Sequence, residues 1–419
     1  MAPIFTREFT LLSIWSFLVG NNFYSLLTAV PLYALRVLKL TEAEAGVAAG
    51  LFIAGMLASR FASGKLMERL GFRIMLIGNL VFLIVFTLFY FIVDTPAGLY
   101  ILRMASGIFY GLLINTILTL VSSIIPASRT GEGVGYYSMI QMSAWAVGPF
   151  ISIYFSNQGD YNNLFLYCAV LPALIFATLP FFRLSRIHEA IARSDDAHLD
   201  DALAADTLPA DALPDDTLSA REETFFEKFL EPAVLPIAAC CVFLIMFNSA
   251  VTSFVAPFSE TMGLEDSSSV FFIFYVIGLL ATRPIVSKLY DRKGATFVMI
   301  PGVCIYVVAY LVLANANSHF SLMLAAVLIG VGLGACQNTT LALALSSVPR
   351  RRVGFASSTY YVAFDTCASA GPMIAGLLIP LIGYRYMFTV AAIWTAIGLP
   401  VYLLLAKKIL YPGIRSQYK

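Results

Sequence analysis

Charged residues are scarce in this sequence. Only 12% of its 419 residues are Asp, Glu, Lys or Arg, whereas soluble domains contain about 25%. Hydrophobic residues make up 59% of the chain. This composition excludes an ordinary soluble protein and indicates an integral membrane protein. The formal net charge of +1 gives no information about binding partners.

Several signatures of chemical sites are also missing. The six cysteines lie within apolar segments and lack the spacing of metal ligands, so neither a disulfide nor a metal site is expected. The glycines of GVGLGACQNT, from residue 330, lie inside an apolar segment, where glycine serves helix packing rather than phosphate binding. No soluble catalytic domain or basic nucleic-acid patch is present. We therefore expect no enzyme activity, no cofactor and no nucleic-acid partner.

Long apolar segments dominate the rest of the chain. About 20 apolar residues are needed for a helix to cross the ~30 Å hydrocarbon core of a bilayer. A β-barrel would instead show alternating strands of about 10 residues, so the segments predict helices. The sequence thus predicts an all-α integral membrane fold with twelve transmembrane helices. These cover residues 9–35, 44–62, 73–93, 97–121, 132–155, 162–182, 232–257, 268–287, 296–314, 318–345, 354–380 and 384–406.

Basic residues are distributed unevenly between the loops. Cytoplasmic loops of membrane proteins carry an excess of Lys and Arg, so the distribution predicts a plasma (inner) membrane protein with both termini in the cytoplasm. The first apolar run is too long for a signal-peptide core and is expected to remain as the first helix. In this orientation the outer loops contain only Arg36, Lys39 and Arg385, and the inner loops contain Lys65, Arg69, Arg73, Arg129, Lys288, Arg292, Lys293, Arg350, Arg351 and Arg352.

The two halves of the chain repeat each other. A single offset of 223 residues separates Arg60 from Arg283, and it relates many other identical residues without a gap. An even number of helices separates the copies, so both halves have the same orientation. We expect two parallel six-helix bundles, residues 1–182 and 231–419. The matched pairs include Gly55/Gly278, Gly107/Gly330, Gly111/Gly334, Asn115/Asn338, Arg129/Arg352, Gly148/Gly371 and Pro149/Pro372.

Residues 183–230, between the halves, have a different composition. Aspartates recur every five residues, prolines interrupt the stretch, and no aromatic residue occurs from 194 to 220. Such a segment buries too little apolar surface to fold alone. A disordered acidic cytoplasmic linker is expected, with a regulatory docking segment as the alternative.

A short charged motif occurs once in each half. In the first copy Gly64, Glu68, Arg69, Gly71 and Arg73 resemble the loop between helices two and three of the major facilitator superfamily. Glu68 replaces the usual aspartate, which the second copy keeps, and Ser287 replaces the first glycine of that copy. The resemblance implies a cytoplasmic gate; the alternative is a loop that only sets topology by its positive charge. The gate residues of the second copy are Asp291, Arg292 and Gly294.

Residue patterns in three of the expected helices resemble those of proton-driven antiporters of that superfamily. Arg103, followed by Gly107 and Gly111, is similar to the fourth-helix pattern in which the arginine is linked to proton coupling. Its alternative role is to extend to the outer headgroups. Glycine–proline pairs in helices five and eleven resemble the exporter pattern, although Ala144 stands where a glycine is often found. A helix kink that serves packing is the alternative. The pairs are Gly148 with Pro149 and Gly371 with Pro372.

Asp365 is the acid expected deepest in the membrane, about halfway along helix eleven. Apolar surroundings favour the neutral form of a carboxyl group, so Asp365 can load and release a proton. It is our first candidate for proton coupling, together with Arg103. The alternative is a structural acid bonded to Thr366, Ser369 or a tyrosine. Helix one, where relatives of this kind often keep an acid, has Asn21 and Asn22 instead.

The resemblance implies a central substrate cavity lined mainly by helices one, four, seven and ten. Polar and aromatic residues on these helices, and on helices five and eleven, are the substrate candidates, although a lone amide in a membrane helix often only bonds to a neighbouring helix. The paired amides are the strongest of them, because they are unfavourable to bury without partners. The candidates are Asn21, Asn22, Tyr24, Asn115, Gln141, Trp145, Asn248, Gln337, Asn338, Tyr360 and Tyr361.

The absence of an ATP-binding signature means that uphill transport would depend on an ion gradient. We therefore expect a monomeric secondary transporter in the lipid bilayer that exports a small molecule, a drug-like compound or a metabolite, in exchange for protons by alternating access. The alternatives are a proton-coupled importer or a uniporter of sugars or other metabolites, a lipid or lysolipid flippase, and a non-transporting receptor.

Overall fold

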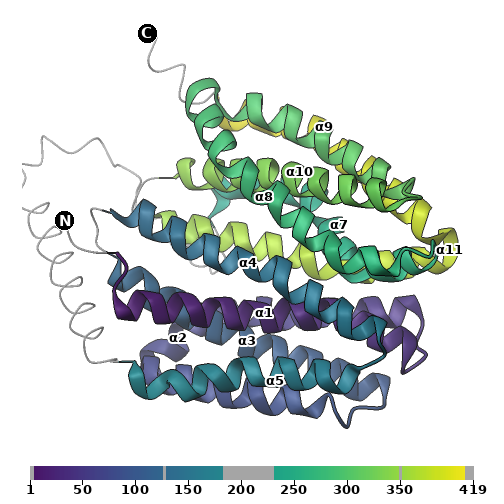
Figure 1. Ribbon diagram of the computed structural model, residues 1–419. Coiled ribbons are helices and arrows are strands. Elements are labelled where there is room, and N and C mark those ends of the chain that lie inside the picture. Colours follow the sequence, from purple (N-terminus) through teal and green to yellow (C-terminus); the bar gives the residue numbers. More distant parts are fainter. Residues whose placement is uncertain (1–3, 126–128, 183–230, 349–351, 411–419) are drawn as a thin grey trace, which may run out of the picture.

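The computed structural model describes residues 4–125, 129–182, 231–348 and 352–410, and all regular structure within these residues is helical. The expected linker at 183–230, and Arg350 and Arg351, lie outside them. In Figure 1 the helices of the first half form the lower part of the bundle and those of the second half the upper part. The α-helices are α1 (Arg7–Arg36), α2 (Glu42–Phe89), α3 (Pro96–Ile124), α4 (Thr130–Asn157), α5 (Tyr161–Thr178), α7 (Leu235–Glu260), α8 (Glu265–Lys293), α9 (Ala295–Ala314), α10 (His319–Ser346) and α11 (Val353–Leu410), with short 3-10 turns η2 (Leu179–Phe181) and η4 (Pro232–Val234).

Two of these ten α-helices are each divided by a single glycine, so the described residues contain twelve helical segments. Gly71 in α2 has φ 75° and ψ 158°, and Gly383 in α11 has φ 77° and ψ 166°. Gly294, between α8 and α9, adopts φ 82° and ψ 169°. Glycine adopts this backbone conformation without the steric penalty of a side chain. The predicted helices left a loop at residues 63–72, but the residues of the charged motif are helical on both sides of Gly71.

Eight helices in the described part of the chain are long and apolar enough to cross a membrane. The two-part helices α2 and α11 are among them, whereas α1 and α4 are more polar. Each of these two helices contributes polar residues to a cavity described below. The prediction of an all-α integral membrane fold is confirmed.

The sequence repeat is also a repeat of helix packing. A Cβ atom added to Gly55 would lie 2.3 Å from the carbonyl oxygen of Met104, and one added to Gly278 would lie 2.3 Å from that of Val327. Met104 and Val327 are separated by the same offset as the two glycines. Backbones therefore touch at equivalent points in the α2–α3 and α8–α10 seams. The reciprocal contacts are Gly107 with Phe52, and Gly330 with Tyr275, each at 2.0 Å from the carbonyl oxygen.

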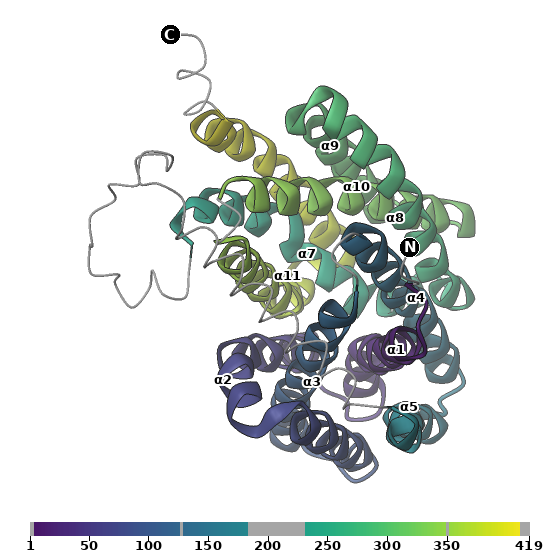
Figure 2. The ribbon, with the colours of Figure 1, turned by 90° about the vertical axis from the view of Figure 1, so that its left-hand side faces the viewer.

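The two halves meet most extensively along two helix pairs. Figure 2 shows α11 beside α2 and α4 beside α8. Close approaches in the first pair again depend on glycine: an added Cβ on Gly46 would lie 2.2 Å from the carbonyl oxygen of Pro372, and one on Gly376 would lie 2.3 Å from that of Glu42. These contacts lie toward one end of the bundle. We call it the Arg36 end, after the last residue of α1, and we call the opposite end the Gly71 end.

The close packing of α2 against α3 predicts that alanine has different effects on stability at two glycines of the first half. Gly107→Ala should lower the thermal unfolding temperature in detergent, because overpacking costs about 1–3 kcal/mol. The matched control is Gly78→Ala, where the added Cβ meets nothing within 4 Å. Alanine there should leave stability unchanged or raise it by about 0.5–1 kcal/mol. Equal unfolding temperatures for the two variants would contradict the backbone contact.

Candidate functional site

A cavity of about 980 Å³ lies between the two halves. It extends to the Gly71 end, where its wall includes Gly64 and Glu68 of α2, Ser138 of α4 and Phe355 of α11. Deeper in the bundle, residues of α1, α3, α7, α8 and α10 complete the wall. A volume of this size matches sites for small molecules.

The cavity is closed off at the Arg36 end by polar contacts between the halves. Arg36 of α1 forms an ion pair with Glu260 of α7, and it donates a hydrogen bond of 2.5 Å to the carbonyl oxygen of Ser156. Asn157 of α4 donates to the carbonyl oxygen of Glu265 at 3.0 Å. Among the described residues, the cavity thus reaches the Gly71 end of the bundle, whereas the Arg36 end is held closed.

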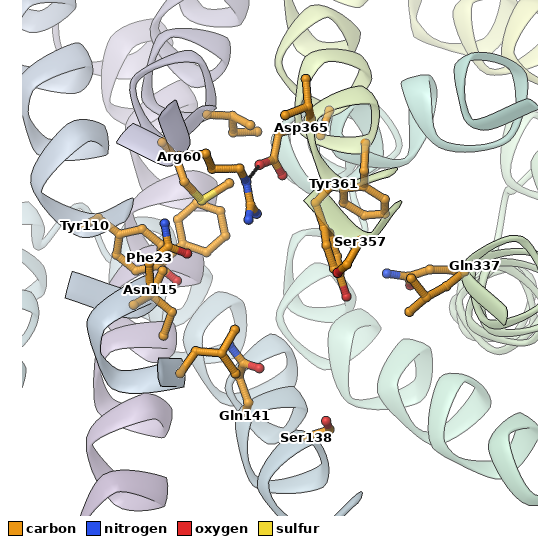
Figure 3. Close-up of a pocket in the computed structure, with 18 of the residues that line it drawn as sticks. Phe23, Arg60, Tyr110, Asn115, Ser138, Gln141, Gln337, Ser357, Tyr361 and Asp365 are labelled. Carbon is orange, nitrogen blue, oxygen red and sulfur yellow. Dashed lines mark hydrogen bonds and ion pairs between the residues drawn. The ribbon is translucent and has the colours of Figure 1, made fainter. Parts of the chain in front are cut away.

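A buried ion pair connects the halves at the inner part of the cavity. Arg60 of α2 donates a hydrogen bond from Nε to Oδ2 of Asp365 of α11, as Figure 3 shows. Only 3% of the Asp365 side chain is exposed, against 27% of Arg60. The guanidinium of Arg60 also lies 5.2 Å from the ring centre of Tyr361. Asp365 is therefore an acid whose partner belongs to the other half of the protein.

The alternative partners expected for Asp365 bond elsewhere. Thr366 donates to the carbonyl oxygen of Val362, and Ser369 donates across to that of Gly50 at 2.8 Å. Sequence reasoning did not identify Arg60 as a functional residue. The available signal was the match of Arg60 with Arg283, two arginines at equivalent positions in the repeats, but the match was used only as evidence of the repeat.

Arg283, the repeat partner of Arg60, has a different environment. It lies in the cavity wall on α8, partly buried, with Tyr361 as an electrostatic neighbour. It forms no ion pair or hydrogen bond with any described residue, and its Nε atom is buried without a partner. The inner cavity therefore contains one paired and one unpaired arginine.

Arg103 lies inside the first half rather than in the cavity wall. It is 0% exposed, which excludes the alternative that it extends to the headgroups. Its Nε atom donates to the carbonyl oxygen of Ala48 at 2.9 Å, and Nη1 donates to Tyr90 Oη at 3.4 Å. The guanidinium lies 4.5 Å from the ring centre of Phe52. The structure does not bring Arg103 and Asp365 together.

The substrate candidates fall into two groups. Asn21, Asn22 and Tyr360 do not line the cavity: Asn22 donates to the carbonyl oxygen of Cys168 at 2.7 Å, and Tyr360 hydrogen-bonds Thr340 at 2.9 Å. Asn22 and Tyr360 thus connect neighbouring helices, and the paired amides Asn21 and Asn22, which the sequence favoured, do not line this cavity. The candidates that do line the cavity are Tyr24, Asn115, Gln141, Trp145, Asn248, Gln337, Asn338 and Tyr361.

Asn248 belongs to a polar network that reaches behind the cavity wall. Its Oδ1 atom accepts hydrogen bonds from Tyr275 at 3.3 Å and from Tyr306 at 3.1 Å. Tyr310 in turn donates to Tyr306 at 3.2 Å. The network fixes the direction of Asn248, so its amide nitrogen is the group left for other interactions.

The expected gate and kink residues are placed as follows. Gly64 and Glu68 lie at the cavity mouth, and the charged gate residues Glu68, Arg69, Arg73, Asp291 and Arg292 are exposed without an ion pair to any described residue. Gly71 and Gly294 form the turns described above. The glycine–proline pairs provide close packing: an added Cβ on Gly148 of α4, before Pro149, would lie 2.9 Å from Tyr24 Cβ, and one on Gly371 of α11, before Pro372, would lie 1.8 Å from the carbonyl oxygen of Met246.

Comparisons with known proteins agree with this architecture. The sequence profile of the Major Facilitator Superfamily matches residues 12–372 and 238–415. An uncharacterized MFS-type transporter of Methanocaldococcus jannaschii is 22% identical over 92% of this chain and 94% of its own. A multi-drug resistance efflux pump of Streptococcus pneumoniae is 22% identical over 84% of this chain and 81% of its own.

A solved structure has the same fold. The crystal structure of a POT family transporter in complex with a thioalcohol-conjugated peptide superposes with a TM-score of 0.75 at 16% identity, covering 96% of both chains. With a family profile that spans nearly the whole sequence, this chain belongs to the Major Facilitator Superfamily of membrane transporters.

Proposed function

We propose that the protein is a proton-coupled secondary transporter that moves a small molecule through its central cavity by alternating access. The observation that supports the proposal is the ion pair between Arg60 and Asp365, because it joins the two halves through a buried titratable group. A transporter of this kind needs a proton site whose occupancy changes the contact between its halves.

Arg60 and a proton are alternative ways to neutralise Asp365. A buried carboxylate without a positive partner is strongly unfavourable. When Asp365 binds a proton, its attraction to Arg60 is lost, and the two halves lose a contact near the centre of the bundle. The proton thus favours separation of α2 from α11 at this depth, which the opening of the Arg36 end requires.

In the alternative state of the transport cycle the Arg36 end is open and the Gly71 end is closed. Opening the Arg36 end breaks the pair of Arg36 with Glu260, while the Gly71 end closes around the exposed charges of Glu68 and Asp291. We place the Gly71 end in the cytoplasm, because basic residues are concentrated there. The structure then corresponds to the inward-open state of the plasma-membrane protein.

Two directions of coupling are compatible with this site. Export in exchange for protons is supported by the likeness to an efflux pump, and it requires a cargo that competes with the proton at Asp365. Movement of cargo and proton together is the second candidate, and the unpaired Arg283 favours it, because an anion bound there promotes protonation of Asp365.

Replacing the proposed proton site tests the function. Asp365→Asn should abolish pH-driven accumulation of cargo in proteoliposomes, since the amide cannot bind and release a proton. The control is Asp266→Asn, an exposed acid at the start of α8, which should retain accumulation. Cargo pools are screened with the unmodified protein under both directions of the pH gradient, and the direction that drives uptake separates exchange from co-transport. Full pH-driven accumulation by Asp365→Asn would exclude the proposed proton site.

The contact at the Arg36 end should hold the inward-open state. Arg36→Gln should shift the population toward the outward-open state by up to about fivefold, because a partly exposed pair contributes at most about 1 kcal/mol. Spin labels at Lys39 and Thr261, both exposed, measure the distance across this end in lipid. The charge swap Arg36→Glu with Glu260→Arg should restore the original distribution, and an unchanged distribution in Arg36→Gln would contradict the role of the pair.

A further inference from the structure

The cavity contains more positive than negative charge. The charged residues in its wall, among those described, are Arg60, Lys65, Glu68, Arg283 and Asp365. Lys65 and Glu68 lie near the mouth and balance each other in charge. In the inner part, Asp365 neutralises Arg60, and no described acid neutralises Arg283. The inner cavity therefore has an excess of one positive charge, and of two when Asp365 is protonated.

Arg283 is arranged as a receptor for an anion. Its Nε atom is buried without a hydrogen-bond acceptor, although its side chain faces the cavity. A partly buried guanidinium whose buried Nε atom lacks an acceptor is unfavourable. A carboxylate, sulfonate or phosphate group would supply the missing acceptors, because its oxygens match the planar donor fork of arginine.

A second arginine lies close to the same place. Tyr361 has the guanidinium of Arg60 5.2 Å from its ring centre, and Arg283 is its electrostatic neighbour from α8. The two arginines occupy equivalent positions in the repeated halves, so they approach the central cavity from opposite sides. Arg60 is engaged by Asp365 as long as that carboxyl group is charged.

The rest of the wall is suited to an apolar body. Tyr24, Trp145 and Tyr275 form a continuous aromatic surface, with ring centres 5.1 Å apart in the first pair and 6.1 Å in the second. Aromatic side chains of this kind bind the apolar part of a ligand, while a few polar groups fix its orientation.

We propose that the cargo is an organic anion with an apolar body, bound by Arg283 and, once Asp365 is protonated, by Arg60 as well. The inference rests on the proposed proton site, and it selects co-transport over exchange. Protonation frees Arg60 for the anion, and the bound anion in turn favours the proton on Asp365. The other groups that face Asp365 are Tyr361, Tyr24 on α1 and Tyr110 on α3, and tyrosines carry no charge between about pH 5 and 8.

Three probes with the same ring and different charge test the inference. They are 2-naphthalenesulfonate, 2-naphthylmethylammonium and 2-naphthylmethanol, whose charges stay constant across the pH range used. Binding is measured by equilibrium dialysis against the full-length protein in phosphatidylcholine nanodiscs, with empty nanodiscs as the blank. The measurements are made at about pH 5.5 and about pH 7.5, which lie on either side of neutrality but leave tyrosine uncharged.

The sulfonate should bind best, and Arg283→Gln should weaken its binding by about tenfold or more, as expected for a lost charge-assisted hydrogen bond. Arg283→Lys should retain part of the affinity. Lys293→Gln removes an exposed cation from the same helix and should leave the affinity unchanged. Size-exclusion profiles of each variant show whether it is folded, and Arg283→Lys keeps the test valid if Arg283→Gln does not fold.

The pH dependence separates this inference from the proposed function. Acidification should tighten sulfonate binding to the unmodified protein severalfold, and Asp365→Asn should bind it tightly at both pH values. Preference for the ammonium probe, or sulfonate binding that does not depend on Arg283, would overturn the anion site while leaving pH-driven transport to be judged by its own assay. The link to the proton site would be overturned by a different result. In that result sulfonate binding depends on Arg283, but acidification tightens it in Asp365→Asn as much as in the unmodified protein.

Discussion

A carboxyl group inside a membrane protein has to be neutralised, either by a cation or by a proton. In this protein that requirement falls on Asp365, whose side chain is 3% exposed and whose cation, Arg60, comes from the other half of the chain. The contact between the halves therefore depends on a group that can change its charge. The glycine contacts between α2 and α11 bring these two helices close together, and the pair lies in the wall of the cavity between the halves.

Much of the fold could be predicted from the sequence. Segment length and hydropathy identify the helices because a bilayer requires apolar spans of a minimum length. The fixed offset identifies the repeat, and its glycines predict close packing because backbones approach only where side chains are absent. Gly55 and Gly278 illustrate this: the sequence pairs them, and the structure gives both the same contact with a neighbouring backbone.

The site was less accessible to sequence reasoning. Membrane helices are apolar toward lipid and toward each other, so a polar residue does not reveal which side of its helix faces the cavity. Asn22 therefore could not be distinguished from Asn115, although only the second lines the cavity. The partner of Asp365 lies 305 residues away in the chain, and no periodic pattern connects residues so distant. The burial of Arg103 depends in the same way on the packing of α2 against α3.

The two ion pairs that join described residues of the two halves differ in their access to water. The side chains of Arg36 and Glu260 are 26% and 30% exposed, whereas Asp365 is almost completely enclosed. Dissolved salt screens exposed charges over distances of about 10 Å at 0.1 M ionic strength, but screens enclosed charges much less. Ionic strength therefore weakens the contact of Arg36 with Glu260 much more than the contact of Arg60 with Asp365, so salt and acid act on different contacts between the two halves.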